Sequence, residues 1–328
     1  MKTVKQIITI VVVVAIFALL NLSMYFLITQ RLSNNFSGAT QAQMIDVKSY
    51  LPHEDGSDLP EIETDFKLTE NLPVLDGAAA LVPVYASIID TVYPKGCVKY
   101  DGGVFSDDNY YGENFAQDSV MQYKNTVRGY KAIVDGDTDI FFSAGPSAEQ
   151  AQYAKDQGVE LVFVPIGLEG FVFFVNKNNP VENLTVEQIR KIYACEYTNW
   201  KEVGGADRVI NPVTRLKGSG SQTTFEAFMG NYEIGIKSPL AVFGGSIGFS
   251  FRYYMDGIVE NNAVKMLSLN GVYPSAENIQ SRAYPIVAQF YAIYRADNQN
   301  ENIPLLIDWI LSSEGQNLIE QTGYVKIK

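Results

Sequence analysis

The sequence predicts an α/β fold behind an N-terminal transmembrane helix. Two observations lead to this fold class. A long apolar run lies close to the first residue, which is typical of a membrane span. Further along, apolar segments of strand length alternate with segments that carry helical periodicity or helix caps. Units of strand, turn and helix repeated in this way indicate a largely parallel sheet covered by helices.

The apolar run extends from Ile7 to Ile28, with two lysines before it and an arginine after it. Its length suffices to cross a bilayer, and the early lysines place the N-terminus in the cytoplasm. A cleaved signal peptide, the alternative, has a shorter apolar core. We therefore expect residues 1–31 to be a cytoplasmic N-terminus and a single-pass anchor in the cell membrane. The remainder of the chain then lies on the extracytoplasmic side.

Residues 32–71 are acidic and polar and show little apolar periodicity, so we expect a flexible linker. The only histidine of the chain, His53, lies in this segment, where we expect it to be solvated. Residues 72–328 follow as the folded domain, which is long enough for two lobes with their own cores.

The strands and helices of this domain are expected in a regular order. Strands are predicted at residues 73–75, 139–143, 160–166 and 170–175. Helices are predicted up to residue 92, at residues 125–135, after Ser147, after Thr185 and, as one or two helices, at residues 303–322. Thr185 opens a capping box, because glutamine follows three residues later. Asp76 precedes a glycine and is expected to cap the first helix, with a role as a ligand acceptor as the alternative.

The most informative motif begins at Arg215, which precedes a Gly-Ser-Gly-Ser turn that leads directly into a helix. Backbone N–H groups at the positive end of the helix dipole, together with a guanidinium, suit a small oxyanion. A serine-capped helix without a ligand is the other interpretation. Two further helix starts, at residues 76–80 and 143–147, would face the same anion if all three meet in one cleft.

Composition excludes several classes of function. The net charge is −12, and the first 31 residues contain no acidic residue, so the remainder is strongly acidic and unsuited to nucleic acid. Cys97 and Cys195 are the only cysteines, which argues against a disulfide framework and a zinc site. No Ser/His/Asp set, metal cluster or activated cysteine is evident. We therefore expect no enzyme activity, no cofactor and no bound metal.

Several motifs, in the same order along the chain, resemble the phosphate-binding proteins of bacterial phosphate ABC importers. They lie at residues 76–85, 184–193, 198–204, 218–223 and 309–316. The resemblance covers about residues 72–328. It implies a two-lobed type II periplasmic-binding-protein fold that closes on its ligand by a hinge. Lobe one would hold about residues 72–166 and 268–328, and lobe two about residues 167–267. Residues 244–254 resemble the segment that lies near the family's hinge.

The resemblance also implies a set of ligand-binding residues. They are Ala78, Ala79, Ser143, Arg215, Ser219, Gly220 and Ser221. The two alanines stand where the family has hydroxyl residues. Ala144 replaces the family aspartate that accepts a hydrogen bond from protonated phosphate, and Lys217 replaces another acidic residue. Without that acceptor, the site loses a means of preferring hydrogen phosphate over sulfate.

Two functions are compatible with these features. The first is a membrane-anchored solute-binding component that delivers phosphate, or a related small oxyanion, to the permease of an ABC importer. The alternative is a membrane-anchored sensor or regulatory binding module with altered ligand specificity. The family resemblance favours the first function, whereas the uncleaved anchor and the changed ligand positions favour the second.

Overall fold

The computed structural model describes residues 21–24, 45, 47–102, 115–215, 217–235, 245–255 and 263–327. Within these ranges no helix has the length and apolar character needed to span a membrane. The predicted anchor over residues 1–31 lies almost entirely outside them.

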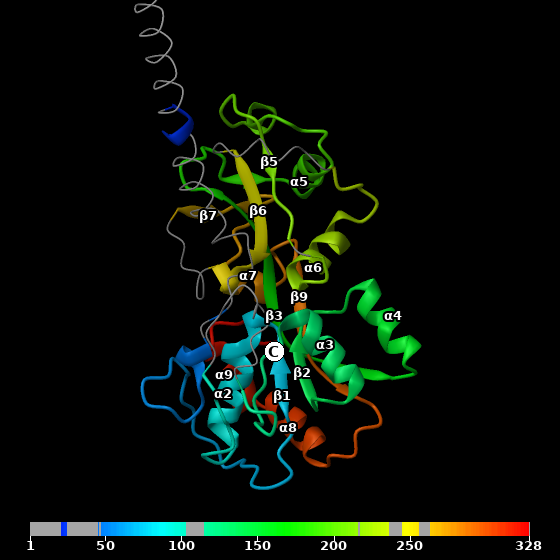
Figure 1. Cartoon of the computed structure of the whole chain (residues 1–328). Helices are drawn as coiled ribbons and strands as arrows, with labels where there is room; N and C mark the ends of the chain where they lie inside the picture. The colour runs from blue at the N-terminus through cyan, green and yellow to red at the C-terminus, as the bar shows by residue number, and fades with distance from the viewer. Residues whose placement is uncertain are drawn as a thin grey trace, which may run out of the picture.

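A mixed sheet forms the centre of the structure (Figure 1). Its strands, in spatial order, are β1 (Leu75–Gly77), β2 (Ile140–Ser143), β9 (Val287–Arg295), β3 (Leu161–Asn176), β6 (Ser246–Phe251) and β5 (Asn211–Pro212), with β7 (Val264–Met266) also paired to β3. A second small sheet pairs β4 (Asn183–Leu184) with β8 (Ser268–Leu269).

The prediction of a largely parallel sheet is wrong. Only β1–β2, β5–β6 and β4–β8 are parallel pairs, whereas β3 pairs antiparallel with β6, β7 and β9. The two strands predicted at residues 160–166 and 170–175 are one strand of 16 residues, β3. β3 pairs with β9 on both sides of a register shift between Pro165 and Gly167. The strand therefore continues through the Gly-containing stretch that separates the two apolar runs.

Helical segments accompany the sheets in the described ranges from residue 47 onward. They are η1 (Val47–Tyr50), η2 (Ala79–Leu81), α2 (Val82–Val92), α3 (Asn125–Asp135), α4 (Ala148–Asp156), α5 (Val186–Tyr193), η4 (Trp200–Val203), α6 (Gly220–Met229), α7 (Ala276–Gln280), α8 (Asn302–Leu311) and α9 (Ser313–Gln321). The predictions of α3 and of capping by Ser147 and Thr185 are confirmed. The C-terminal region contains two helices, α8 and α9.

Two large groups of buried side chains form separate cores. The first packs α2, α8 and α9 against β1 and β2. The second is rich in aromatic rings and packs α5 and α6 against β6 and the second half of β3, where the rings of Phe225 and Phe249 stack at 4.2 Å. Figure 1 shows β3 and β9 running between the two bodies that contain these cores. The two cores suit the expected lobes, whose boundaries stay a prediction.

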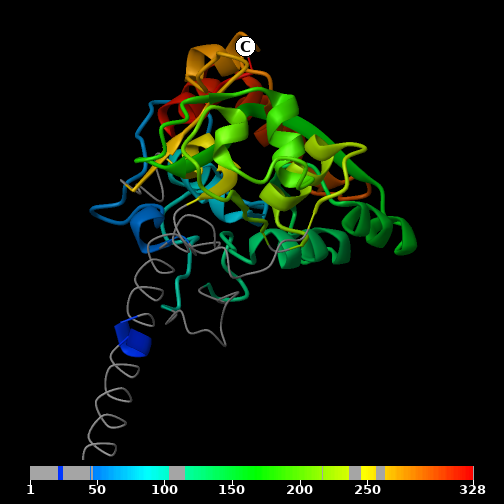
Figure 2. The same ribbon diagram turned by 90° about the horizontal axis from the view of Figure 1, so that it is seen from above.

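Residues 47–71 lie against the first core instead of forming the expected flexible linker, on the outer side of that body in both views (Figures 1 and 2). Leu68 is buried, and the ring of Phe66 stacks on Trp309 with centroids 5.9 Å apart. His53 is not solvated, since its side chain is 12% exposed. The apolar residues of this segment are too widely spaced to form a periodic pattern, so the sequence gives no sign of their packing.

Candidate functional site

A small cavity lies where the ends of β1 and β2 face the start of α6. Its volume is about 30 Å³, space for roughly two water molecules. It is lined by Ala78, Ala80, Leu81, Ser143, Ala144, Glu169, Gly220, Phe251, Ala288, Gln289, Phe290 and Tyr324. The three helix starts singled out in the sequence therefore contribute to one cavity, which lies between residues of both cores.

The start of α6 supplies hydrogen-bond donors. Ser219 is the N-cap, and its hydroxyl accepts a hydrogen bond from the Gln222 N–H at 3.3 Å. The N–H groups of Gly220 and Ser221 have no acceptor within the helix, and they lie at the positive end of its dipole. The side-chain oxygen of Gln222 accepts a hydrogen bond from the Arg215 N–H at 2.9 Å, which fixes the backbone of Arg215 beside this turn.

The opposite wall comes from the ends of β1 and β2. Ser143 is the last residue of β2 and is 2% exposed. The N–H of Ala78 donates to the Phe142 carbonyl at 2.8 Å, so the loop after β1 is tied to β2. Ala79 starts η2 and is adjacent to the cavity lining without belonging to it. Ala144 lies close to α6, since a Cβ added to Gly220 would be 4.0 Å from the Ala144 Cβ.

Asp76 does not cap the first helix, so that prediction is wrong. Its Oδ1 accepts hydrogen bonds from the N–H groups of Gly77 at 2.7 Å and Lys124 at 3.0 Å. Burial raises the pKa of Asp76 to about 6, although Lys124 acts in the opposite direction. The carboxyl thus connects β1 to the segment before α3, and α2 begins without a side-chain cap.

Lys217 is exposed and does not belong to the cavity lining. Its Nζ lies 2.5 Å from Oε1 of Glu149 in the first turn of α4. The pair joins the start of α6 to the start of α4. Three of the predicted ligand residues, Ala78, Ser143 and Gly220, line the cavity. Ala79, Ser219 and Ser221 are sequence neighbours of lining residues, whereas Arg215 lies five residues before Gly220. The binding role of all seven stays a prediction.

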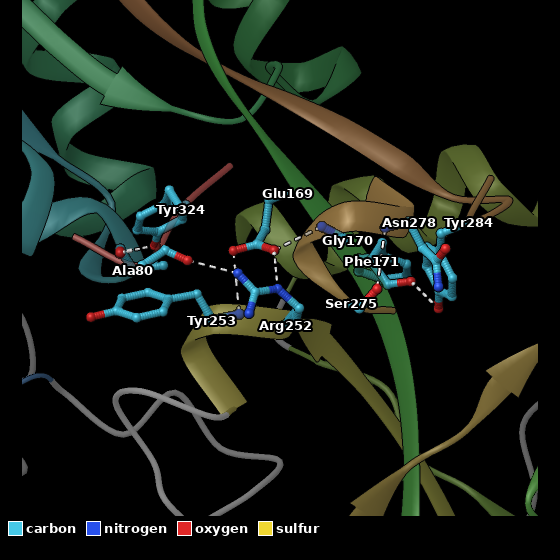
Figure 3. Close-up of polar contacts among 11 residues, drawn as sticks. Ala80, Glu169, Gly170, Phe171, Arg252, Tyr253, Ser275, Asn278, Tyr284 and Tyr324 are labelled. Atoms are coloured by element: carbon cyan, nitrogen blue, oxygen red, sulfur yellow. Dashed lines mark hydrogen bonds and ion pairs between the residues drawn. The ribbon is translucent and has the colours of Figure 1, made fainter. Parts of the chain in front are cut away.

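The sequence analysis missed a buried ion pair at this cavity. Glu169 of β3 lines the cavity and is 3% exposed, and its Oε1 lies 3.3 Å from Nε of Arg252 (Figure 3). Glu169 also accepts hydrogen bonds from the N–H groups of Gly170 at 2.8 Å and Tyr253 at 3.2 Å. Arg252 in turn donates from Nη2 to the Gly323 carbonyl at 2.7 Å. The available signal was an acidic residue in the short stretch between the apolar runs at residues 160–166 and 170–175.

Burial raises the pKa of Glu169 to about 7, an effect larger than the opposing influence of Arg252 and the hydrogen bonds. The carboxyl therefore changes its protonation state close to neutral pH. The C-terminal segment completes this wall of the cavity, because the Tyr324 hydroxyl donates to the Ala80 carbonyl and its ring lies 4.9 Å from that of Phe290. No group of three or more His, Cys, Asp or Glu side chains suited to a metal occurs among the described residues.

Comparisons with known proteins agree with the resemblance seen in the sequence. A model of the PBP superfamily domain matches residues 107–314. The phosphate-binding protein PstS of Borreliella burgdorferi is 27% identical over 211 residues, which are 58% of this chain and 74% of that protein. Protein SphX of Synechococcus elongatus is 25% identical over 301 residues, 79% of this chain and 88% of that protein.

A solved structure supports the same fold. It is that of a putative phosphate ABC transporter substrate-binding protein with bound phosphate from Clostridium perfringens. Its TM-score is 0.57 at 24% identity, and the match covers 80% of this chain and 100% of the other. The predicted periplasmic-binding-protein-like α/β fold is therefore confirmed, as a mixed rather than a largely parallel sheet.

Proposed function

Because this chain belongs to the PBP superfamily, we propose that it is an extracytoplasmic solute-binding protein that holds phosphate or a related small oxyanion for an ABC importer. In this proposal the N-terminal apolar segment anchors the protein in the cell membrane, and a permease receives the ligand. The observation that carries the proposal is the cavity shared by Ala78, Ser143 and Gly220. The relatives named as phosphate-binding proteins support phosphate as the ligand.

The donors suit an anion that is held without chemical change. The first-turn N–H groups of Gly220 and Ser221 offer two hydrogen bonds reinforced by the helix dipole. Ser143 adds a hydroxyl from the opposite wall, and the Arg215 guanidinium adds positive charge beside the turn. In this proposal the loop of Ala78 and Ala79 contributes through its backbone alone, and the Ser219 cap holds α6 in place.

Closure of two lobes on the ligand follows from the same proposal. The walls of the cavity belong to different cores, so a bound anion would contact both and favour the closed arrangement. The contact between Lys217 of the α6 turn and Glu149 of α4 spans the same junction. Because this pair is exposed, the ligand rather than the ion pair should dominate closure.

A sensor or regulatory module is the second candidate function. The composition of the cavity wall supports it. Ala78 and Ala144 line the cavity where hydroxyl and carboxyl side chains would increase selectivity for hydrogen phosphate. In a sensor, the closed form would be read by a partner protein instead of a permease.

Calorimetric titration of the full-length chain in detergent with phosphate, and then with sulfate, tests the proposal. A fragment starting at residue 71 would lack Phe66 and Leu68, which pack on the first core. We expect phosphate binding that weakens by about 10- to 100-fold in Arg215→Gln, because a hydrogen-bonded charge is lost. The exposed Arg208→Gln serves as the control and should bind like the wild type. A folded protein that binds neither anion would refute the oxyanion proposal.

A further inference from the structure

Glu169 is the one carboxyl-bearing residue among the described residues that line the cavity. This matters because hydrogen phosphate and sulfate differ in one respect that a protein can recognise. Hydrogen phosphate carries an O–H that donates a hydrogen bond, whereas sulfate has only acceptors. A site that prefers the protonated anion needs an acceptor directed at that O–H. Ala144 offers only a methyl group at the position where the phosphate-binding proteins that the sequence resembles have an aspartate.

Other polar side chains of the lining are engaged elsewhere. The Tyr324 hydroxyl donates its proton to the Ala80 carbonyl, and the side-chain oxygen of Gln289 accepts a hydrogen bond from the Tyr291 hydroxyl at 3.0 Å. The Ser143 hydroxyl, on the wall opposite α6, is one of the hydrogen-bond donors in the proposed site. Glu169 is therefore the strongest acceptor that the lining contains, since hydrogen bonds to a charged acceptor are roughly twice as strong as those between neutral groups.

The contacts of Glu169 leave acceptor capacity for a ligand. An ionised carboxylate has about four lone-pair positions. Oε1 accepts from Gly170 N–H and from Nε of Arg252, whereas Oε2 accepts from Tyr253 N–H. Figure 3 shows these bonds joining the carboxyl on β3 to the segment after β6. Among the described contacts, one lone pair of Oε2 stays available beyond the Tyr253 bond.

The surrounding charges make a carboxylate compatible with an anion in the same cavity. Arg252 balances the charge of Glu169, so the ion pair as a whole does not repel an anionic ligand. The charge of Glu169 acts on the hydroxyls of Tyr253 and Tyr324, and burial, the larger effect, raises the pKa of both, which keeps them neutral. When the pH is above the Glu169 pKa of about 7, the carboxyl is ionised and can accept a hydrogen bond from an O–H group.

We propose that Glu169 determines the specificity of this cavity for a hydrogen oxyanion such as hydrogen phosphate, by accepting the hydrogen bond from its O–H group. This inference rests on the proposed function, since it requires that the cavity binds an oxyanion. It assigns to β3 the acceptor role that the loop residue Ala144 does not fill.

Calorimetric titration of the full-length chain at pH 8 with phosphate and with sulfate tests this role. In Glu169→Gln the phosphate-to-sulfate affinity ratio should fall by about 10- to 100-fold, the effect of losing one charged hydrogen bond. Glu182→Gln is the control, because it makes the same chemical change in an exposed carboxylate paired with Lys265. Adding Ala144→Asp to Glu169→Gln should restore part of the ratio, since it returns a carboxyl to the cavity wall.

Thermal melting establishes that each variant is folded. Glu169→Asp serves as a second variant that keeps the charge beside Arg252 while withdrawing the carboxyl by one carbon, and it should lower the ratio in the same direction. An unchanged phosphate-to-sulfate affinity ratio in folded variants that still bind phosphate refutes the proposed role of Glu169 but leaves the proposed function standing. A wild type that binds neither anion refutes the proposed function.

Discussion

The variant Glu169→Gln also isolates the pH dependence of one buried carboxyl. In the folded chain, burial raises the pKa of Glu169 from an ordinary 4.5 to about 7. Below pH 4.5 the carboxyl is protonated in both the folded and the unfolded chain. As the pH rises, the unfolded chain ionises first, so the stabilising contribution of the protonated form is lost between about pH 4.5 and pH 7.

The expected magnitude follows from the size of this shift. Each pKa unit corresponds to about 1.4 kcal/mol, so the free energy of unfolding should fall by about 3 kcal/mol across this window. Arg252 stays charged throughout, so removing its partner changes the stability of Glu169→Gln by an amount that is independent of pH. Asp76, whose pKa is also raised by burial, titrates in both proteins and cancels in the comparison. The wild type should therefore lose about 3 kcal/mol more than the variant between pH 4.5 and pH 8.

Urea unfolding followed by tryptophan fluorescence at pH 4.5, 6 and 8 measures both profiles. The exposed Glu182→Gln serves as the control, with a profile parallel to that of the wild type. Parallel profiles for Glu169→Gln and the wild type would refute the reasoning, because they would mean that the folded chain does not favour the protonated carboxyl.

Three further variants test the packing. In Gly167→Ala the new Cβ would lie 2.1 Å from Cζ of Phe290, which should lower the free energy of unfolding by about 1–3 kcal/mol. Gly145→Ala, where nothing lies within 4 Å of the added Cβ, should change the free energy of unfolding by less than about 0.5 kcal/mol. Equal effects of the two substitutions would contradict the close packing of Gly167 against Phe290. Phe66→Ala removes the ring stacked on Trp309 and should lower the free energy of unfolding by about 2 kcal/mol, whereas an unchanged urea midpoint would mean that residues 47–71 are a flexible linker after all.

The features predicted correctly from the sequence depend on local chemistry. Ser147 and Thr185 cap their helices because each hydroxyl meets the N–H of a glutamine three residues later. The pairing of strands depends instead on contacts between distant residues. An apolar strand shows the same pattern whether its neighbour is parallel or antiparallel, so nothing in the sequence of β3 indicated its antiparallel pairing with β9.

The distinction between local chemistry and distant contacts also separates the site residues that the sequence predicted from those that it did not. The turn from Gly218 to Ser221 was recognisable because a helix start determines its own hydrogen-bond donors. Glu169 and Tyr324 reach the cavity through tertiary packing, one from the interior of a long strand and the other from the C-terminal segment. Their neighbours in sequence give no indication of the cavity, since Arg252 and Ala80 lie far away in the chain.

A purely structural role explains Glu169 poorly. Replacing a buried ion pair by well-packed apolar side chains is often neutral or stabilising, so the pair with Arg252 is not by itself a reason for a carboxyl at this place. Above pH 7 the ionised carboxylate makes the fold less stable than the protonated carboxyl does below pH 4.5. Asp76, the other buried carboxyl with a raised pKa, connects β1 to the segment before α3 and lies outside the cavity lining. Glu169 lines the cavity, and in the proposed role its carboxylate would accept a hydrogen bond from the O–H of hydrogen phosphate, a group that sulfate lacks, which would give its unfavourable burial a functional explanation.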